Sequence, residues 1–264
     1  MSEKAKQWDR AAAEFQRTFR LGVNPYIQAC LSFWEEKGMI FPGCRVLDVG
    51  CGVGKYGTLL AARGCDVTLT DISEEMLSYA EQNMAPFSTP YRLFACDFDE
   101  ADVNEAAFFP RFDFCFSTMS PAIHDPATLQ KLSTLSRGWC FVAGFVSSDA
   151  VLRRQVREAA GLTEAAPKKT PLREGHTTME ELKEMVSGLG FSPEMITVPY
   201  DWADRRTVKE QAALMRERYW KDLPEAADYD RKTLAFLESL ADADGTVSDE
   251  VRTEVAWLYW RVWP

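Results

Sequence analysis

Short apolar segments alternate with amphipathic segments between residues 45 and 146. The apolar segments have the length of buried strands and lie at 45–49, 66–71, 91–95, 112–117 and 139–146. The segments between them have helical spacing, which predicts helices at Lys55–Arg63, Ser73–Met84 and Ala127–Leu135. This alternation predicts an α/β fold with a mostly parallel sheet and helices on both faces.

Helical patterns flank this region on both sides. Leu21–Gly38 and the aromatic segment before it predict a helical N-terminal extension over residues 1–40. Residues 163–175 have the composition of a loop. A helix is expected after Thr178, which can form a capping box with Glu181, and is expected to end near residues 188–190.

The last sixty residues predict further helices and one more strand. Residues 204–241 have the pattern of two amphipathic helices separated at Pro224. The aromatic and branched residues of 254–263 favour a strand, and a helix capped by Ser248 is the alternative. We expect a single domain over 1–264, with a core at 41–150 and a C-terminal part at 151–264 that carries the helical insertion 204–241.

Composition excludes several classes of protein. The 264 residues are 46% hydrophobic, and 40 acidic against 30 basic residues give a net charge of −10. This charge argues against a nucleic-acid partner or an anionic membrane. The seven cysteines have no C-x-x-C spacing and there are two histidines, so we expect reduced thiols and no metal site. No apolar run is long enough to span a membrane, which favours a cytoplasmic protein.

The strongest chemical signal is a glycine-rich turn after the first strand. Residues 46–57 read Val-Leu-Asp-Val-Gly-Cys-Gly-Val-Gly-Lys-Tyr-Gly, and the absence of side chains lets a ligand approach the backbone at a helix N-terminus. Gly52, Gly54 and Gly57 also fit a dinucleotide motif, but Asp48 would repel a pyrophosphate. An acid beside this turn favours a ligand with a cationic head group, although the glycines could serve only the strand–helix turn.

Residues 46–57 resemble motif I of the class I S-adenosylmethionine-dependent methyltransferases. The resemblance continues after the second, third and fourth strands, at Asp71, at Asp97-Phe98 and at residues 112–120, and so covers residues 45–146. It implies the seven-stranded sheet of the family, with an antiparallel edge formed by 194–199 and 254–263. The segment Leu135–Trp139 departs from the glycine-rich turn that is usual in the family before the fifth strand.

The resemblance implies S-adenosylmethionine as the cofactor and assigns residues to it. Asp71 is expected to bind the ribose, Asp97 the adenine amino group, and Phe98 the adenine ring, while Met119 borders the methionine part. The N-terminal aromatics Trp8, Phe15 and Tyr26 are similar to the lid of the family. The predicted cofactor-binding residues are Asp48, Gly50, Cys51, Gly52, Gly54, Asp71, Ile72, Met76, Asp97, Phe98, Met119 and Tyr26.

The function implied is methyl transfer to an O, N, S or C atom of a small molecule, and the sequence does not indicate an oligomeric state. His124 is the candidate general base, and the acceptor pocket is expected between the N-terminal helices and 204–241, lined by Tyr26, Met119, His124, Tyr200 and Trp202. Simpler roles exist: Asp71 could cap the next helix, Asp97 could belong to a solvated acidic loop, and His124 could cap a turn. A nicotinamide-dependent oxidoreductase and a non-catalytic S-adenosylmethionine-binding protein are the alternative functions.

Overall fold

The computed structural model describes residues 2–19, 25–162 and 177–263, and these divide into two compact units. The first unit comprises 1–144, 176–197 and 256–264, and the second comprises 145–175 and 198–255. The predicted loop at 163–175 lies outside the described residues.

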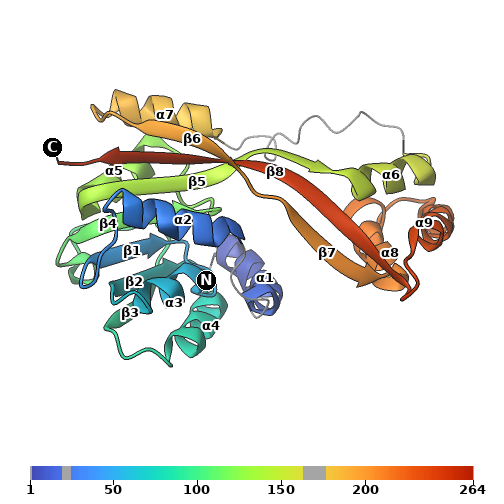
Figure 1. The fold of residues 1–264 in the computed structure, drawn as a ribbon, viewed down its shortest axis with the longest axis horizontal. Coiled ribbons are helices and arrows are strands. Elements are labelled where there is room, and N and C mark those ends of the chain that lie inside the picture. Colours follow the sequence, from blue (N-terminus) through green and yellow to red (C-terminus); the bar gives the residue numbers. More distant parts are fainter. Residues whose placement is uncertain (1, 20–24, 163–176, 264) are drawn as a thin grey trace. The chain divides into compact units, whose positions relative to one another are not determined.

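The first unit has the predicted α/β core (Figure 1). Its helices are α1 (Glu3–Phe19), α2 (Pro25–Glu36), α3 (Lys55–Ala61), α4 (Glu74–Met84), α5 (Pro126–Leu135) and α7 (Met179–Gly188), with a 3-10 turn at Ala106–Phe108. Its strands are β1 (Arg45–Val49), β2 (Asp66–Asp71), β3 (Tyr91–Ala95), β4 (Phe112–Thr118) and most of β6 (Glu194–Pro199), with the first part of β5 (Ser136–Ala150) and the last part of β8 (Thr246–Arg261).

The strand order β3-β2-β1-β4-β5-β8-β6 places β1 between β2 and β4. All four pairings from β3 to β5 are parallel, with Leu47 of β1 opposite Thr68 of β2 on one side and Cys115 of β4 on the other. Successive strands are therefore added on one side of β1 as far as β3, and on the other side from β4 onward. Open α/β sheets bind ligands at such a switch point, at the carboxyl ends of the strands.

Alternating residues of β4 pack against helices on opposite faces of the sheet. Trp34 of α2 lies against Phe114 and Phe116, with ring centroids 5.0 and 4.8 Å apart. Cys115, between these two phenylalanines, lies in a second buried cluster that includes Leu129 of α5 and residues of α7. Helices on both faces, as predicted, follow from this period of two.

The second unit contains α6 (Val151–Ala160), β7 (Trp202–Thr207), α8 (Val208–Tyr219) and α9 (Ala226–Leu240). β7 pairs antiparallel with the first part of β8, with Trp202 opposite Val251 and Thr207 opposite Thr246. The three helices enclose a separate apolar cluster around Leu152, Trp220 and Leu237.

The structure corrects the sequence prediction at three places. The described residues form eight strands rather than seven, because 202–207 pair with β8. The predicted insertion therefore begins with a strand, and its two helices follow on either side of Pro224. The last strand begins at Thr246 rather than 254, so Ser248 lies within a strand and caps no helix. Helix α6 was not predicted.

Candidate functional site

The glycine turn after β1 is held by the end of β2. Gly50, Gly52 and Gly54 all have positive φ angles, of 74°, 52° and 76°. The main-chain N–H groups of Gly50 and Cys51 donate to the carbonyl oxygen of Thr70, over 2.8 and 3.1 Å. Left-handed backbone is unfavourable for residues with a Cβ atom, so the turn requires its glycines.

Neighbouring side chains also leave little room for a Cβ atom at two of these glycines. A Cβ at Gly50 would lie 2.0 Å from Oγ of Ser120, which belongs to the loop after β4. A Cβ at Gly54, the N-cap of α3, would lie 3.1 Å from that of Ala80 in α4. The turn is therefore packed closely between the loop after β4 and helix α4.

Asp71, at the end of β2, contacts both the glycine turn and the start of α4. Its Oδ2 accepts a hydrogen bond from the N–H of Gly52 over 2.9 Å, and its Oδ1 accepts one from the N–H of Ser73 over 3.0 Å. Burial raises the pKa of Asp71, while these two N–H groups oppose the increase. Ser73 itself is the N-cap of α4, because its Oγ accepts from the N–H of Met76.

The predicted neighbours of Asp71 lie along the start of α4. Ile72 is half-buried, and Met76 is buried. The sulfur of Met76 is 4.0 Å from the position that a Cβ at Gly52 would occupy. The structure thus brings Met76, Gly52 and Asp71 together.

Asp48 is a buried acid at the same edge of the sheet. Its side chain is 2% exposed, and its Oδ2 has no hydrogen-bond partner among the described residues. Burial raises the pKa of Asp48 well above its ordinary value, and the nearby Asp71 raises it further. Burial also raises the pKa of the Cys51 thiol well above its ordinary value, with added contributions from Asp48 and Asp71. Two carboxyl groups, of Asp48 and Asp71, therefore lie near each other, and a nearby cation would favour their ionised forms.

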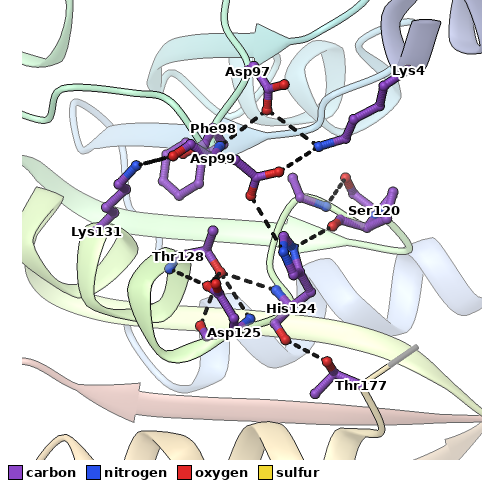
Figure 2. Close-up of polar contacts among 12 residues, drawn as sticks. Lys4, Asp97, Phe98, Asp99, Ser120, His124, Asp125, Thr128, Lys131 and Thr177 are labelled. Carbon is purple, nitrogen blue, oxygen red and sulfur yellow. Dashed lines mark hydrogen bonds and ion pairs between the residues drawn. The ribbon is translucent and has the colours of Figure 1, made fainter. Parts of the chain in front are cut away.

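The residues after β3 do not all face the same way. Asp97 is half-buried, and its Oδ1 accepts from the N–H of Asp99 over 3.2 Å and lies 3.4 Å from Nζ of Lys4 (Figure 2). Phe98 is 3% exposed and belongs to the apolar cluster that also contains Leu47. The core thus encloses the Phe98 ring, for which the sequence predicted an adenine contact.

The loop after β4 carries Met119, Ser120 and His124. Met119 has a φ of 54°, in the left-handed region although it is not a glycine, and its N–H donates to the carbonyl of Ala143 over 2.9 Å. His124 Nδ1 lies 3.1 Å from the carbonyl oxygen of Pro121, and Nε2 lies 3.6 Å from Oδ1 of Asp99 (Figure 2). Both ring nitrogens of His124 therefore face oxygen atoms of the protein.

The remaining predicted residues lie in other surroundings. Tyr26 of α2 is buried, and its hydroxyl accepts from Nε1 of Trp257 in β8 over 3.0 Å. In the second unit, Tyr200 stacks on Phe145, and the guanidinium of Arg153 lies over the ring of Trp202. Their predicted contacts with an acceptor stay predictions.

Helix α1 supplies contacts to the turn that the sequence did not indicate. Oγ of Ser73 donates to Asp9 over 2.6 Å, and Gln16 exchanges two hydrogen bonds with Asn83, of 3.0 and 2.8 Å. Asn83 also donates to the carbonyl of Val53 in the glycine turn over 2.9 Å. A polar residue on an amphipathic helix looks the same in sequence whether it faces water or a distant loop, so no local signal identified them.

Three further observations concern metal ligands, cysteines and membrane-spanning helices. Within the described ranges, no three His, Cys, Asp or Glu side chains are grouped so that they could hold a metal ion. All seven cysteines are free thiols, five of them buried. None of the helices that the structure describes is long and apolar enough to cross a membrane.

Comparisons with known proteins agree with this geometry. The sequence pattern of the methyltransferase domain family matches residues 46–137, from β1 into β5. Magnesium-protoporphyrin O-methyltransferase of Rhodobacter capsulatus is 46% identical over 78 residues, which are 30% of this chain and 34% of that protein. Ubiquinone biosynthesis O-methyltransferase of Aromatoleum aromaticum is 30% identical over 130 residues, 48% of this chain and 51% of that protein. The matches thus span between a third and a half of these relatives.

The fold is similar over a longer part of the chain. The crystal structure of the YcgJ protein of Bacillus subtilis superposes with a TM-score of 0.52 at 12% identity, over 90% of this chain and 99% of that one. At this identity the similarity concerns the fold alone. The matched residues 46–137 contain the glycine turn, Asp71 and Asp97, the same positions that the site is built from. Residues 46–137 therefore carry the sequence pattern of the methyltransferase domain family.

Proposed function

We propose that this protein binds S-adenosylmethionine at the carboxyl ends of β1, β2 and β3 and transfers its methyl group to a small-molecule acceptor. The observation that carries the proposal is the buried Oδ2 of Asp48, which has no hydrogen-bond partner among the described residues and lies before a turn of three left-handed glycines. A buried acid with an unused acceptor atom fits a cationic ligand, and the turn lets that ligand approach the backbone.

The acids at this edge of the sheet supply the remaining contacts. Each oxygen of the Asp71 carboxylate accepts one main-chain N–H and retains capacity for a second donor, such as a ribose hydroxyl. The carboxylate of Asp97 can accept a hydrogen bond from the amino group of an adenine. The ligand lies against the glycine turn, at Gly50, Cys51, Gly52 and Gly54. Its borders are formed by Ile72, Met76 and Met119.

The chemistry that the cofactor supplies is a methyl group on a positively charged sulfur, an activated donor. The protein then has to hold the acceptor in line, keep water away, and remove a proton where the acceptor requires it. Buried residues around the turn, such as Val53 and Met76, exclude water. His124 is the one predicted general base, and we propose a different role for it below.

A small acceptor is supported by charge and by the relatives. The net charge of −10 gives no attraction for a nucleic acid. The two curated relatives are named as O-methyltransferases of magnesium-protoporphyrin and of ubiquinone biosynthesis. We infer an acceptor of comparable class, a small organic molecule, and assign no particular atom as the one methylated.

Ligand-induced stabilisation tests the proposal directly. S-adenosylhomocysteine at about a hundred times its dissociation constant should raise the free energy of unfolding by about 2.7 kcal/mol, whereas NAD at the same concentration should leave it unchanged. Denaturant midpoints with and without each ligand give the result. Stabilisation by NAD alone would contradict the proposal and favour an oxidoreductase. The Asp48→Asn variant should lose most of the stabilisation that S-adenosylhomocysteine gives the unaltered protein.

A further inference from the structure

The carboxylate of Asp99 lies between helix α1 and the loop after β4. Its Oδ2 is 2.7 Å from Nζ of Lys4 in α1, and its Oδ1 is 3.6 Å from Nε2 of His124 (Figure 2). Both elements lie next to the glycine turn. Gln16 of α1 bonds to Asn83, which donates to the carbonyl of Val53, and Ser120 of the loop after β4 lies against Gly50.

The main chain of Asp99 is fixed from two directions. Its N–H donates to the side chain of Asp97 over 3.2 Å, and its carbonyl accepts from Nζ of Lys131 in α5 over 2.7 Å. Lys131 also donates to the carbonyl of Phe98, whose ring is buried in the core. The main chain of Asp99 is therefore fixed by hydrogen bonds, although its side chain is 37% exposed.

His124 is held equally firmly on the other side. Its Nδ1 faces the carbonyl of Pro121 over 3.1 Å, its N–H donates to Oγ1 of Thr128 over 3.2 Å, and its carbonyl accepts from Oγ1 of Thr177 over 2.5 Å. A general base needs a ring nitrogen that faces the acceptor's proton. In this arrangement the two ring nitrogens face Pro121 and Asp99 instead, which suits a residue that holds a loop.

The Lys4 contact is the corresponding anchor of α1. Lys4 lies in the first turn of the helix and reaches both Asp97 and Asp99, while Asp9 and Gln16 make the contacts farther along. Without the contact at Lys4, the first turns of α1 would be held by fewer tertiary contacts and would open more often.

We propose that Asp99 is a positioning residue that joins α1 to the loop after β4, through Lys4 and His124, and so holds together two elements that lie next to the cofactor site. In this role His124 positions the loop and removes no proton. The inference rests on the proposed function only for its effect on the cofactor, since the joining of the two elements is a property of the protein without ligand.

Amide hydrogen exchange and calorimetry on the full-length protein test the two parts separately. Asp99→Ala should increase exchange in residues 3–12, and should weaken the binding of S-adenosylhomocysteine, each by about twofold to tenfold, the range for one or two exposed ion pairs. Lys4→Met should act in the same direction. Adding it to Asp99→Ala should have a smaller effect than Lys4→Met alone, because only the longer Lys4–Asp97 contact of 3.4 Å is then left to lose. Glu100→Ala removes a neighbouring exposed carboxylate and is the matched control, expected to change neither measurement.

The possible outcomes are distinguishable. Unchanged exchange in α1 with Asp99→Ala would overturn the anchoring role. Increased exchange with unchanged affinity would overturn the link between the anchor and the cofactor site. If the unaltered protein does not bind S-adenosylhomocysteine, the proposed function fails, and exchange still decides whether Asp99 holds α1. The denaturant midpoint of each variant establishes that it folds, as expected for an exposed residue.

Discussion

The carboxylate of Asp71, at the end of β2, accepts a hydrogen bond from the N–H of Gly52 over 2.9 Å. This bond holds the glycine turn that follows β1. The same side chain accepts the N–H of Ser73 at the start of α4. One residue thereby fixes two main-chain segments that the proposed cofactor would contact.

Replacement of Asp71 should therefore affect stability and binding together. Asp71→Ala removes the acceptor of two N–H groups and should lower the free energy of unfolding by about 1–3 kcal/mol. It should also weaken the binding of S-adenosylhomocysteine by about 30- to 1,000-fold, through the lost ribose contacts. Asp71→Asn keeps one acceptor oxygen and should recover part of both losses. Denaturant midpoints and calorimetry measure them, and a loss of stability at full affinity would assign Asp71 to the fold alone.

The buried Asp48 predicts how stability changes with pH. Because burial raises its pKa in the folded state, the folded protein binds a proton that the unfolded chain has released above about pH 4. The contribution of Asp48 to stability is thus complete below about pH 4 and is lost as the pH rises through the raised pKa. Asp48→Asn should flatten this decline, measured as urea midpoints between pH 5 and pH 9. A decline as steep as that of the unaltered protein would contradict the prediction.

Gly50 and Ser120 predict a pairwise effect on folding. Gly50→Ala introduces a Cβ 2.0 Å from Oγ of Ser120 in a left-handed conformation, and should lower the free energy of unfolding by about 2–5 kcal/mol. Adding Ser120→Gly removes the contacting side chain and should restore about 1–3 kcal/mol of the free energy of unfolding. The loss that remains is the cost of placing an alanine in a left-handed backbone conformation.

Gly43 provides the matched control for this pair. Its φ is 83°, and no heavy atom of the described residues, apart from Gly43 and its two chain neighbours, lies within 4 Å of the position that a Cβ would take. Gly43→Ala should therefore lower the free energy of unfolding only by the cost of a left-handed alanine, about 1–2 kcal/mol. Equal losses for Gly43→Ala and Gly50→Ala, compared by urea denaturation, would mean that Ser120 moves aside without resistance.

The hydroxyl of Tyr26 predicts a stability effect in the core. Tyr26→Phe leaves Nε1 of the buried Trp257 without this acceptor and should lower the free energy of unfolding by about 1–3 kcal/mol. Tyr259→Phe removes a hydrogen bond to Glu194, whose side chain is 62% exposed and can be solvated instead, so it should lower stability by less than about 1 kcal/mol. Similar losses in the two variants would show that water reaches Trp257.

Features that depend on neighbouring residues were readable from the sequence. Although β5 extends beyond its predicted bounds of 139–146 at both ends, the first four core strands, the Ser73 cap of α4 and the capping box of Thr178 with Glu181 lie where the pattern predicted them. So does the turn of Gly50, Gly52 and Gly54, because alternation, caps and left-handed turns are each specified within a few residues. Ser73, and not Asp71, is the N-cap of α4, and the cofactor contact of Asp71 stays a prediction.

Features that depend on distant partners were decided only by the tertiary structure. Residues 202–207 form a strand because β8 extends back to Thr246 and offers them a partner, which their own polar sequence does not reveal. Phe98 turns into the core, and Tyr26 pairs with Trp257, 231 residues along the chain. Lys4 and Asp99 are 95 residues apart, and either would read as a solvated surface charge. Folding brings such side chains together through the packing of whole helices and strands, and no local pattern encodes which charged residue will face another.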